Sequence, residues 1–87
     1  MPKYNTVFES KEEIYGILPR ANDWVHYSAV LQVKDGGKFP VVLEMEFVPP
    51  HPYAFNMPEK QVIRAVSVTD AYAKVSKFFY KFGIRFQ

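Results

Sequence analysis

The sequence predicts an α+β fold in which a three-stranded antiparallel sheet is flanked in chain order by two helices. Side chains alternate between apolar and polar over residues 24–34 and again over 38–48, and Asp-Gly-Gly at 35–37 is typical of a turn. Apolar residues recur at three- and four-residue steps over 68–82, which is typical of an amphipathic helix. We therefore expect the order helix-strand-strand-strand-helix, with the C-terminal helix packed on one sheet face.

Length and composition exclude several classes of protein. A chain of 87 residues supplies one core, so residues 1–87 are expected to form a single domain. The chain contains no cysteine, which excludes a disulfide scaffold, a zinc ribbon and a thiol nucleophile. No apolar run approaches the roughly 20 residues that span a bilayer, and the first residues do not resemble a secretory signal. We therefore expect a cytoplasmic protein with no membrane segment.

The first predicted element is a short helix over residues 10–18. Ser10 and Glu13 have the spacing of a capping box, in which each side chain bonds a backbone N–H of the other residue. Pro19 would end this helix, because a residue before proline avoids the α conformation. Residues 4–8 suit either an edge strand or an ordered tail. The apolar stripe of the helix consists of Ile14, Ile17 and Leu18.

The two central strands are expected to form a hairpin whose odd-numbered side chains face the core. Directly opposed residues point to the same face, so an odd-numbered residue of one strand must lie opposite an odd-numbered residue of the other. The two residue numbers of each pair then have an even sum. A three-residue loop over 35–37 satisfies this condition. On the core face it pairs Val33 with Phe39, Leu31 with Val41, Ala29 with Leu43, Tyr27 with Met45, and Val25 with Phe47. On the other face it pairs His26 with Glu46 and Ser28 with Glu44.

The last third of the chain is expected to supply the third strand and the second helix. Prolines at 49, 50, 52 and 58 exclude a central strand there, and a strand is predicted over 61–66. A second capping box at 67–70 starts a helix that continues to Phe82. Gly83 suits the left-handed position after a helix, where Ile84 could contact Phe79.

The element order resembles that of double-stranded RNA-binding domains. That family places lysines at the start of the last helix and a Gly-Pro-x-His turn between its first strands. This chain has Ser67-Val68-Thr69-Asp70 at the first place and lacks the second motif. The resemblance therefore covers element order alone and implies no function.

Charge divides the chain into two unlike parts. Residues 1–59 carry five basic and eight acidic side chains, whereas 60–87 carry six basic and one acidic. Lys74, Lys77 and Lys81 share one face of the final predicted helix. This stripe either grips phosphates or an acidic protein patch, or is an ordinary solvated helix face.

Two surfaces are candidates for docking. The proline-rich segment alternates Tyr53, Phe55 and Met57, which could anchor a partner or fold back on the core. The sheet face away from the core carries Trp24 and Val42 and is more apolar than solvent exposure requires. Either part of the chain covers this face, or it remains a contact surface.

Enzyme chemistry and metal binding have little support. His26, Glu44 and Glu46 lie on an open sheet face and provide only three ligand candidates, so a His–carboxylate pair is the simpler interpretation. Ser28 beside His26 and Glu46 has no oxyanion donors around it. His51 is expected to be a solvent-exposed loop residue. No catalytic residue, metal or cofactor is therefore predicted.

These patterns favour a small non-enzymatic protein-binding module, of an accessory or inhibitor type such as viruses encode. Its predicted contact residues are Tyr53, Phe55, Met57, Trp24 and Val42. Unpaired strand edges also suggest a homodimer. The alternative is a nucleic-acid-binding protein that holds phosphates with basic side chains and stacks bases on Trp24 or Tyr53. Those basic residues are Arg64, Lys74, Lys77, Lys81 and Arg85.

Overall fold

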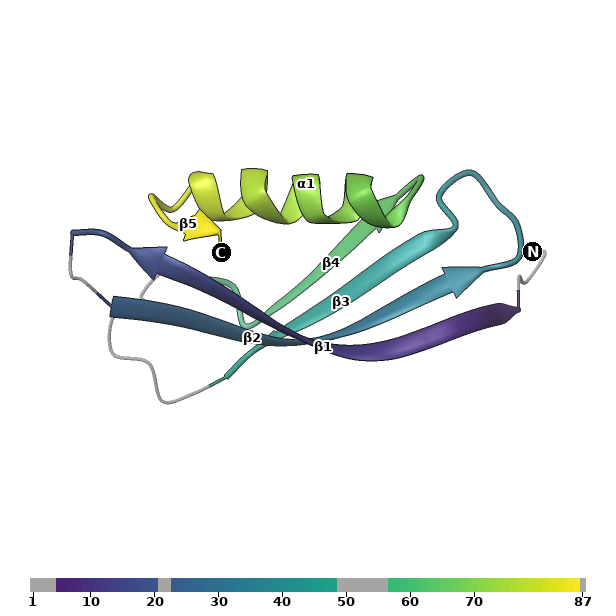
Figure 1. The fold of residues 1–87 in the computed structure, drawn as a ribbon, viewed down its shortest axis with the longest axis horizontal. Coiled ribbons are helices and arrows are strands. Elements are labelled where there is room, and N and C mark those ends of the chain that lie inside the picture. Colours follow the sequence, from purple (N-terminus) through teal and green to yellow (C-terminus); the bar gives the residue numbers. More distant parts are fainter. Residues whose placement is uncertain (1–4, 21–22, 49–56, 87) are drawn as a thin grey trace.

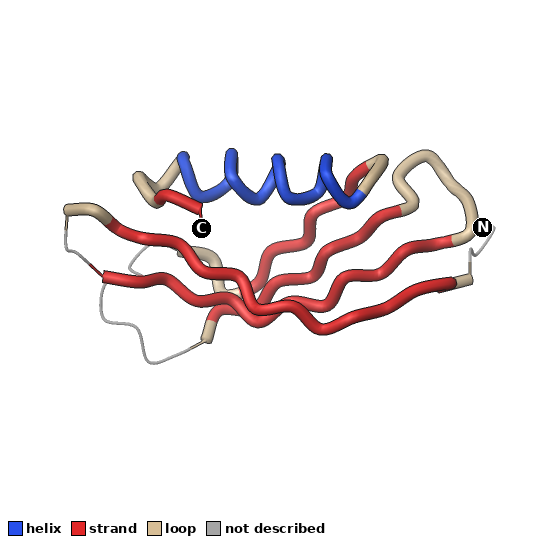
Figure 2. The backbone as a smooth tube through the Cα atoms, in the orientation of Figure 1, coloured by secondary structure: helices blue, strands red, loops and turns tan. Residues whose placement is uncertain are grey.

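A computed structural model of the chain describes residues 5–20, 23–48 and 57–86. Within these ranges the chain forms one antiparallel sheet with strand order β4-β3-β2-β1-β5, and one helix lies across a face of it (Figures 1 and 2). We call this the helix-facing face and the opposite one the outer face. The elements are β1 (Thr6–Leu18), β2 (Asp23–Lys34), β3 (Val41–Phe47), β4 (Lys60–Ala65), α1 (Val68–Tyr80) and β5 (Arg85–Phe86).

The predicted first helix is wrong, because this segment belongs to the long strand β1. β1 pairs with β2 along its whole length, and its side chains alternate, with Ile14 and Gly16 buried and Tyr15 exposed between them. A nine-residue helix with an internal glycine is marginal alone, whereas β2 offers a full-length partner edge. The three-stranded sheet and the helix-strand-strand-strand-helix order are therefore wrong. The likeness in element order to double-stranded RNA-binding domains ends with them.

The hairpin has the predicted faces but a different register. Odd-numbered side chains of β2 and β3 do point to the helix-facing face, yet the strands are shifted by two residues. A two-residue shift keeps every side chain on its face, so the apolar pattern is satisfied by both registers. The observed pairs are Val33 with Val41, Leu31 with Leu43, Ala29 with Met45, Tyr27 with Phe47, Ser28 with Glu46, and Val30 with Glu44.

The turn accounts for the register. The Lys34 N–H donates to the Pro40 carbonyl at 2.7 Å, which closes a loop longer than the predicted three residues. Gly37 adopts a φ of 98°, a conformation that glycine allows without steric cost. Phe39, predicted to oppose Val33 in the core, lies in this loop and is 42% exposed. β3 accordingly begins at Val41 and not at residue 38.

The fourth strand and the helix follow their predictions closely. β4 lies within one residue of the predicted strand, and the Ser67 hydroxyl caps α1 by accepting the Asp70 N–H at 3.0 Å. The Asp70 carboxylate accepts the Val66 N–H at 3.1 Å, one residue earlier than a standard capping box would use. The helix begins where its cap predicts and ends at Tyr80, two residues before the predicted end.

A glycine turn after the helix produces the short strand β5. The Ile84 N–H donates to the Phe79 carbonyl at 3.0 Å, and Gly83 has a φ of 74°, as expected for a Schellman motif. The turn brings Arg85 and Phe86 back against β1, where they pair with Ile17 and Gly16. This strand was not predicted, since two residues leave no periodic signal.

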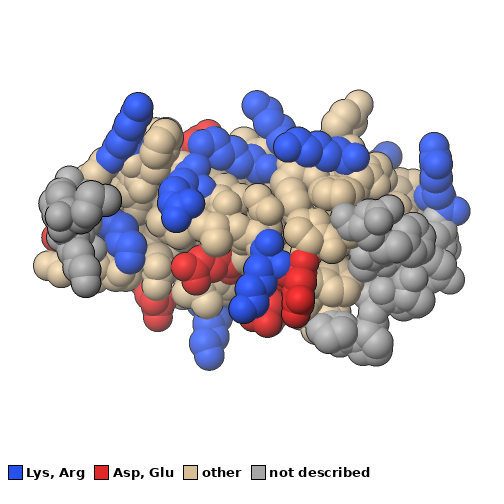
Figure 3. Space-filling view, turned by 180° about the vertical axis from the view of Figure 1, so that it is seen from behind, with Lys and Arg blue, Asp and Glu red and all other residues tan. Residues whose placement is uncertain are grey.

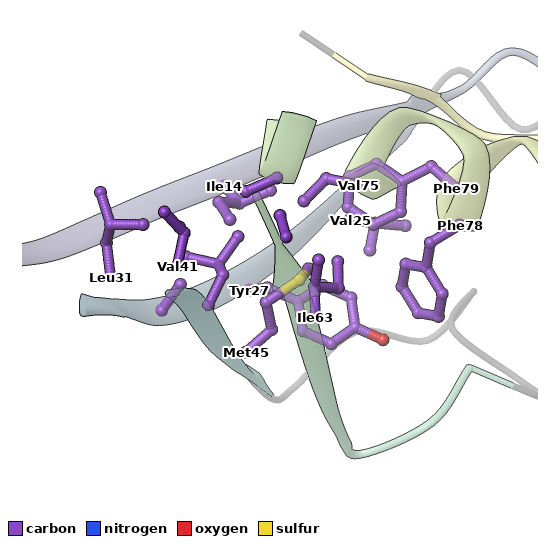
Figure 4. Close-up of a cluster of buried hydrophobic side chains, with 14 of the residues drawn as sticks. Ile14, Val25, Tyr27, Leu31, Val41, Met45, Ile63, Val75, Phe78 and Phe79 are labelled. Atoms are coloured by element: carbon purple, nitrogen blue, oxygen red, sulfur yellow. The ribbon is translucent and has the colours of Figure 1, made fainter. Parts of the chain in front are cut away.

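The core lies between α1 and the helix-facing face of the sheet. Val75, Phe78 and Phe79 of the helix pack against side chains from the strands, among them Tyr27 and Ile63 (Figure 4). In the part of the chain that the structure describes, no helix is long and apolar enough to cross a membrane. The buried set is Ile14, Val25, Tyr27, Ala29, Leu31, Val41, Leu43, Met45, Ile63, Ala65, Ala71, Val75, Phe78, Phe79 and Ile84.

Among the described residues, Tyr27 is the one buried core residue with a hydroxyl, and we expect it to make stability sensitive to high pH. Its hydroxyl donates to the Pro58 carbonyl at 2.7 Å, and burial raises the pKa of the phenol to about 12. Between pH 10 and 12 the unfolded chain releases this proton and the folded chain keeps it, so stability falls as pH rises. Urea unfolding of the native chain and of Tyr27→Phe measures this contribution.

The Tyr27→Phe variant should lose less stability than the native chain between pH 10 and 12. Below pH 10 it should be less stable than the native chain by about 1 kcal/mol, because the Pro58 carbonyl loses its donor. Tyr72, whose pKa is also raised, mainly by burial and further by Glu12, is present in both proteins and cancels in the comparison. Parallel pH curves for the two proteins would contradict the assignment to Tyr27.

Candidate functional site

The predicted docking residues do not form one surface. Trp24 is half exposed on the outer face near the start of β2, whereas Val42, opposite Gln32, lies near the other end of the sheet. At about 3.3 Å per strand residue, Trp24 and Gln32 are roughly 26 Å apart. Met57 is partly buried against the core. The predicted contacts Tyr53 and Phe55, like His51, lie outside the described residues.

The surroundings of Trp24 and His26 differ from the prediction. Tyr15 of β1 stacks on the His26 ring with centroids 4.5 Å apart and meets the Trp24 ring edge-on at 6.4 Å. His26 bonds the Glu13 carboxylate, so the predicted pair with Glu46 is wrong. The sequence could not reveal this cluster, because residues 10–18 were assigned to a helix.

The structure brings no metal-binding group together within residues 5–20, 23–48 and 57–86. His26 is engaged by β1, and Glu44 and Glu46 lie opposite Val30 and Ser28 on β2. The three residues considered as metal ligands therefore do not converge.

The basic residues, in contrast, do converge. A hollow between β4 and α1, which we call the basic groove, is lined by four of the five cations named for the nucleic-acid alternative. Figure 3 shows Lys and Arg side chains gathered over the upper half of the molecule, where α1 lies, with most acidic ones below them. Arg85 lies apart on β5, beside Tyr80 and Ser76. The groove is lined by Arg64, Lys74, Lys77 and Lys81 with Gln61, Val62, Ile63 and Phe78.

Lys74 anchors one end of the basic groove. Its ammonium group donates to the Arg64 carbonyl at 2.8 Å, lies 3.5 Å from the Asp70 carboxylate and sits 5.3 Å from the centre of the Phe39 ring. Its charge is thus partly balanced and its position fixed.

The other three basic residues of the basic groove differ from Lys74 in their surroundings. Among the described residues, neither Lys77 nor Lys81 nor the Arg64 guanidinium has an acidic partner, and all three residues are exposed. Lys77 and Lys81 recur on one helix face, four residues apart, so their charges point the same way. The groove consequently offers concentrated positive charge to an anionic ligand.

The floor of the basic groove is an open strand edge. β4 pairs with β3 on one side, and no described strand adjoins its other side. The N–H and C=O of one strand residue point to the same side, and this side alternates along the strand. Because the Arg64 carbonyl reaches Lys74, the backbone groups of Lys60, Val62 and Arg64 face away from β3. The Phe47 N–H donates to the Glu59 carbonyl at 2.7 Å, so the Glu59 carbonyl points toward β3. The backbone groups of the next residue, Lys60, accordingly point away from β3.

Comparison with known proteins adds no assignment: no family model, curated protein or solved structure matches the chain. The sequence identified the lysine stripe of the groove from its helical spacing. It could not identify the open edge of β4, since strand order is a property of the whole sheet.

Proposed function

We propose that this chain is a non-enzymatic binding protein whose basic groove takes up an acidic, extended segment of a protein partner. The observation that carries the proposal is the position of Lys77 and Lys81, which have no acidic partner among the described residues, beside outward-facing backbone groups of β4. An extended peptide meets both features at once, because its backbone pairs with a strand edge while its side chains reach neighbouring charges. The lack of cysteine suits a reducing compartment, so we place this binding in the cytoplasm.

The spacing of the lysines supports an extended ligand. Alternate side chains of a strand are about 6.6 Å apart and point to the same face. Lys77 of α1 and Lys81, the C-cap residue that follows the helix, are four residues apart, which is about 6 Å along a helix axis. Acidic side chains at alternate positions of an added strand would therefore face successive lysines. Lys74 holds the Arg64 carbonyl, so the added strand would pair with the edge from Lys60 to the Arg64 N–H.

A nucleic acid is the alternative ligand, since phosphates also match the charges. Two features favour the peptide. Outward N–H and C=O groups of a strand complement a peptide backbone, whereas a phosphate backbone uses only the donors. The exposed Phe39 ring, which contacts Lys74 of the groove, already has the Lys74 and Lys38 ammonium groups 5.3 and 5.8 Å from its centre, where they occupy positions that a stacked base would need.

Charge reversal in the basic groove tests the proposal. Fluorescence anisotropy should show binding of a labelled peptide of alternating Glu and Val, and weaker or no binding when Lys replaces Glu in the peptide. Lys77→Glu combined with Lys81→Glu should reduce the affinity for the Glu-Val peptide by about tenfold or more, because attraction becomes repulsion.

A matched variant distinguishes an effect of charges in the groove from an effect of the net charge of the protein. Arg20→Glu combined with Arg85→Glu changes the net charge equally but away from the groove, and should leave the affinity within about twofold of native. An equal loss in both double variants would reject the groove as the site. Tight binding of oligo(dT) with no binding of the Glu-Val peptide would reject the peptide in favour of the nucleic acid.

A further inference from the structure

β1 has a long edge that no described strand pairs with over most of its length. One side of β1 pairs with β2 from Thr6 to Leu18, whereas the other side pairs with β5 only at Gly16 and Ile17. No described strand pairs with the second side of β1 along residues 6–15. We call this stretch the open β1 edge. Such an edge is a template for another strand.

Charged side chains restrict what can pair with the open β1 edge. Glu9, Lys11, Glu12 and Glu13 follow one another closely, and like charges placed directly opposite each other destabilise a strand pair. Glu9 and Lys11 share the outer face, since they pair with Gln32 and Val30 of β2. A partner strand must therefore place a positive group opposite Glu9 and a negative group opposite Lys11.

We infer that the partner is a second copy of this chain, paired antiparallel through β1 with the twofold axis at Ser10. In this register Glu9 of each copy lies opposite Lys11 of the other, which gives two attractive pairs. The paired region covers residues 6–14, nearly the full open β1 edge. Glu9 already accepts a hydrogen bond from Gln32 at 2.7 Å through one carboxylate oxygen, which leaves the second oxygen for the lysine.

The neighbouring symmetric registers are less favourable. An axis at Glu9 or Glu12 sets that residue against its own copy, and an axis at Lys11 opposes two lysines and also opposes Glu9 to Glu13. An axis at Phe8 brings no charges into opposition but pairs only residues 6–10 of the open edge. Charge therefore selects the axis at Ser10.

The dimer also accounts for an exposed aromatic residue and preserves the basic groove. Phe8 on this edge is 52% exposed, and pairing places it across from Glu12 of the other copy, whose methylene groups would cover part of the ring. The two sheets would join into one, with β4 at both outer ends because strand order is β4-β3-β2-β1-β5. Each copy would thus keep its groove accessible.

Sedimentation or light scattering of the full chain tests this dimer. The native chain should have a mass of twice 10.1 kDa at high concentration. Lys11→Glu places a glutamate opposite Glu9 in both cross-strand pairs. This repulsion should weaken dimerisation by about tenfold or more. Adding Glu9→Lys to Lys11→Glu exchanges the two charges and should restore the dimer, which a merely destabilised fold would not do.

Lys77→Glu is the control, because it makes the same charge change in the basic groove and should leave the dimer intact. A native chain that stays monomeric overturns the inference. A dimer whose dissociation constant is the same for Lys11→Glu and the native chain overturns it as well. Neither result bears on peptide binding, which the groove variants test separately.

Discussion

Phe79→Ala is expected to lower the free energy of unfolding by about 3–5 kcal/mol, the range for removing a ring from a closed core. Phe79 is fully buried, and its ring centre lies 5.9 Å from that of Tyr27, 5.6 Å from Phe78 and 5.9 Å from Phe86. It therefore joins α1 to β2 and β5 at once. Since small domains have a stability of about 5–15 kcal/mol, this loss is a large fraction of the total.

The adjacent residue provides the control for this prediction. Tyr80 follows Phe79 in α1 but is 82% exposed, so Tyr80→Ala should change stability by no more than about 0.5 kcal/mol. Urea denaturation followed by circular dichroism measures both variants. Similar midpoints for the two would show that α1 does not pack on the sheet through Phe79.

Gly16→Ala is expected to destabilise the protein by about 2–3 kcal/mol through overpacking. A Cβ atom at this position would lie 2.4 Å from the Ile84 Cγ2 and 3.3 Å from the Phe79 ring. Both neighbours are buried, and the Ile84 side chain is branched at Cβ, which restricts its rotamers, so neither side chain has room to move aside. The glycine thus permits the close approach of β1 to the turn that follows α1.

A double-mutant cycle identifies the contact responsible. Ile84→Ala removes the methyl group that the new Cβ would meet, so Gly16→Ala should cost less in that background than in the native chain. Urea unfolding of the four proteins gives the coupling energy. Additive costs would contradict the proposed clash and point to backbone conformation instead.

The predictable parts of this fold are those in which one segment fixes its own structure. α1 carries its cap at Ser67, its apolar stripe and its terminal Gly83 within the segment, and the alternation of β2 and β3 fixes which side chains face inward. β1 is different, because its helical spacing and capping residues are consistent with two structures. Pairing with β2 selects the strand over the helix, and the edge of β2 that β1 pairs with exists only in the assembled sheet.

The hairpin register and the site both depended on information that the pattern of apolar and polar residues does not carry. Two registers of the hairpin give identical faces, and the Lys34–Pro40 bond that selects one depends on the loop conformation. The lysine stripe was visible in the sequence, but the position of Arg64 beside it required the edge location of β4. Trp24 and Val42 were rightly placed on one face, yet sequence alternation carries no information on their separation.

Amide hydrogen exchange in the presence of the Glu-Val peptide tests the central claim most directly. If the peptide adds as a strand to β4, exchange should slow at the Val62 and Arg64 N–H groups, which face the basic groove. The Ile63 N–H, which points toward β3, should already be protected and change little. Uniform slowing along β4, or slowing confined to α1, would contradict strand addition and remove the basis for the proposed function.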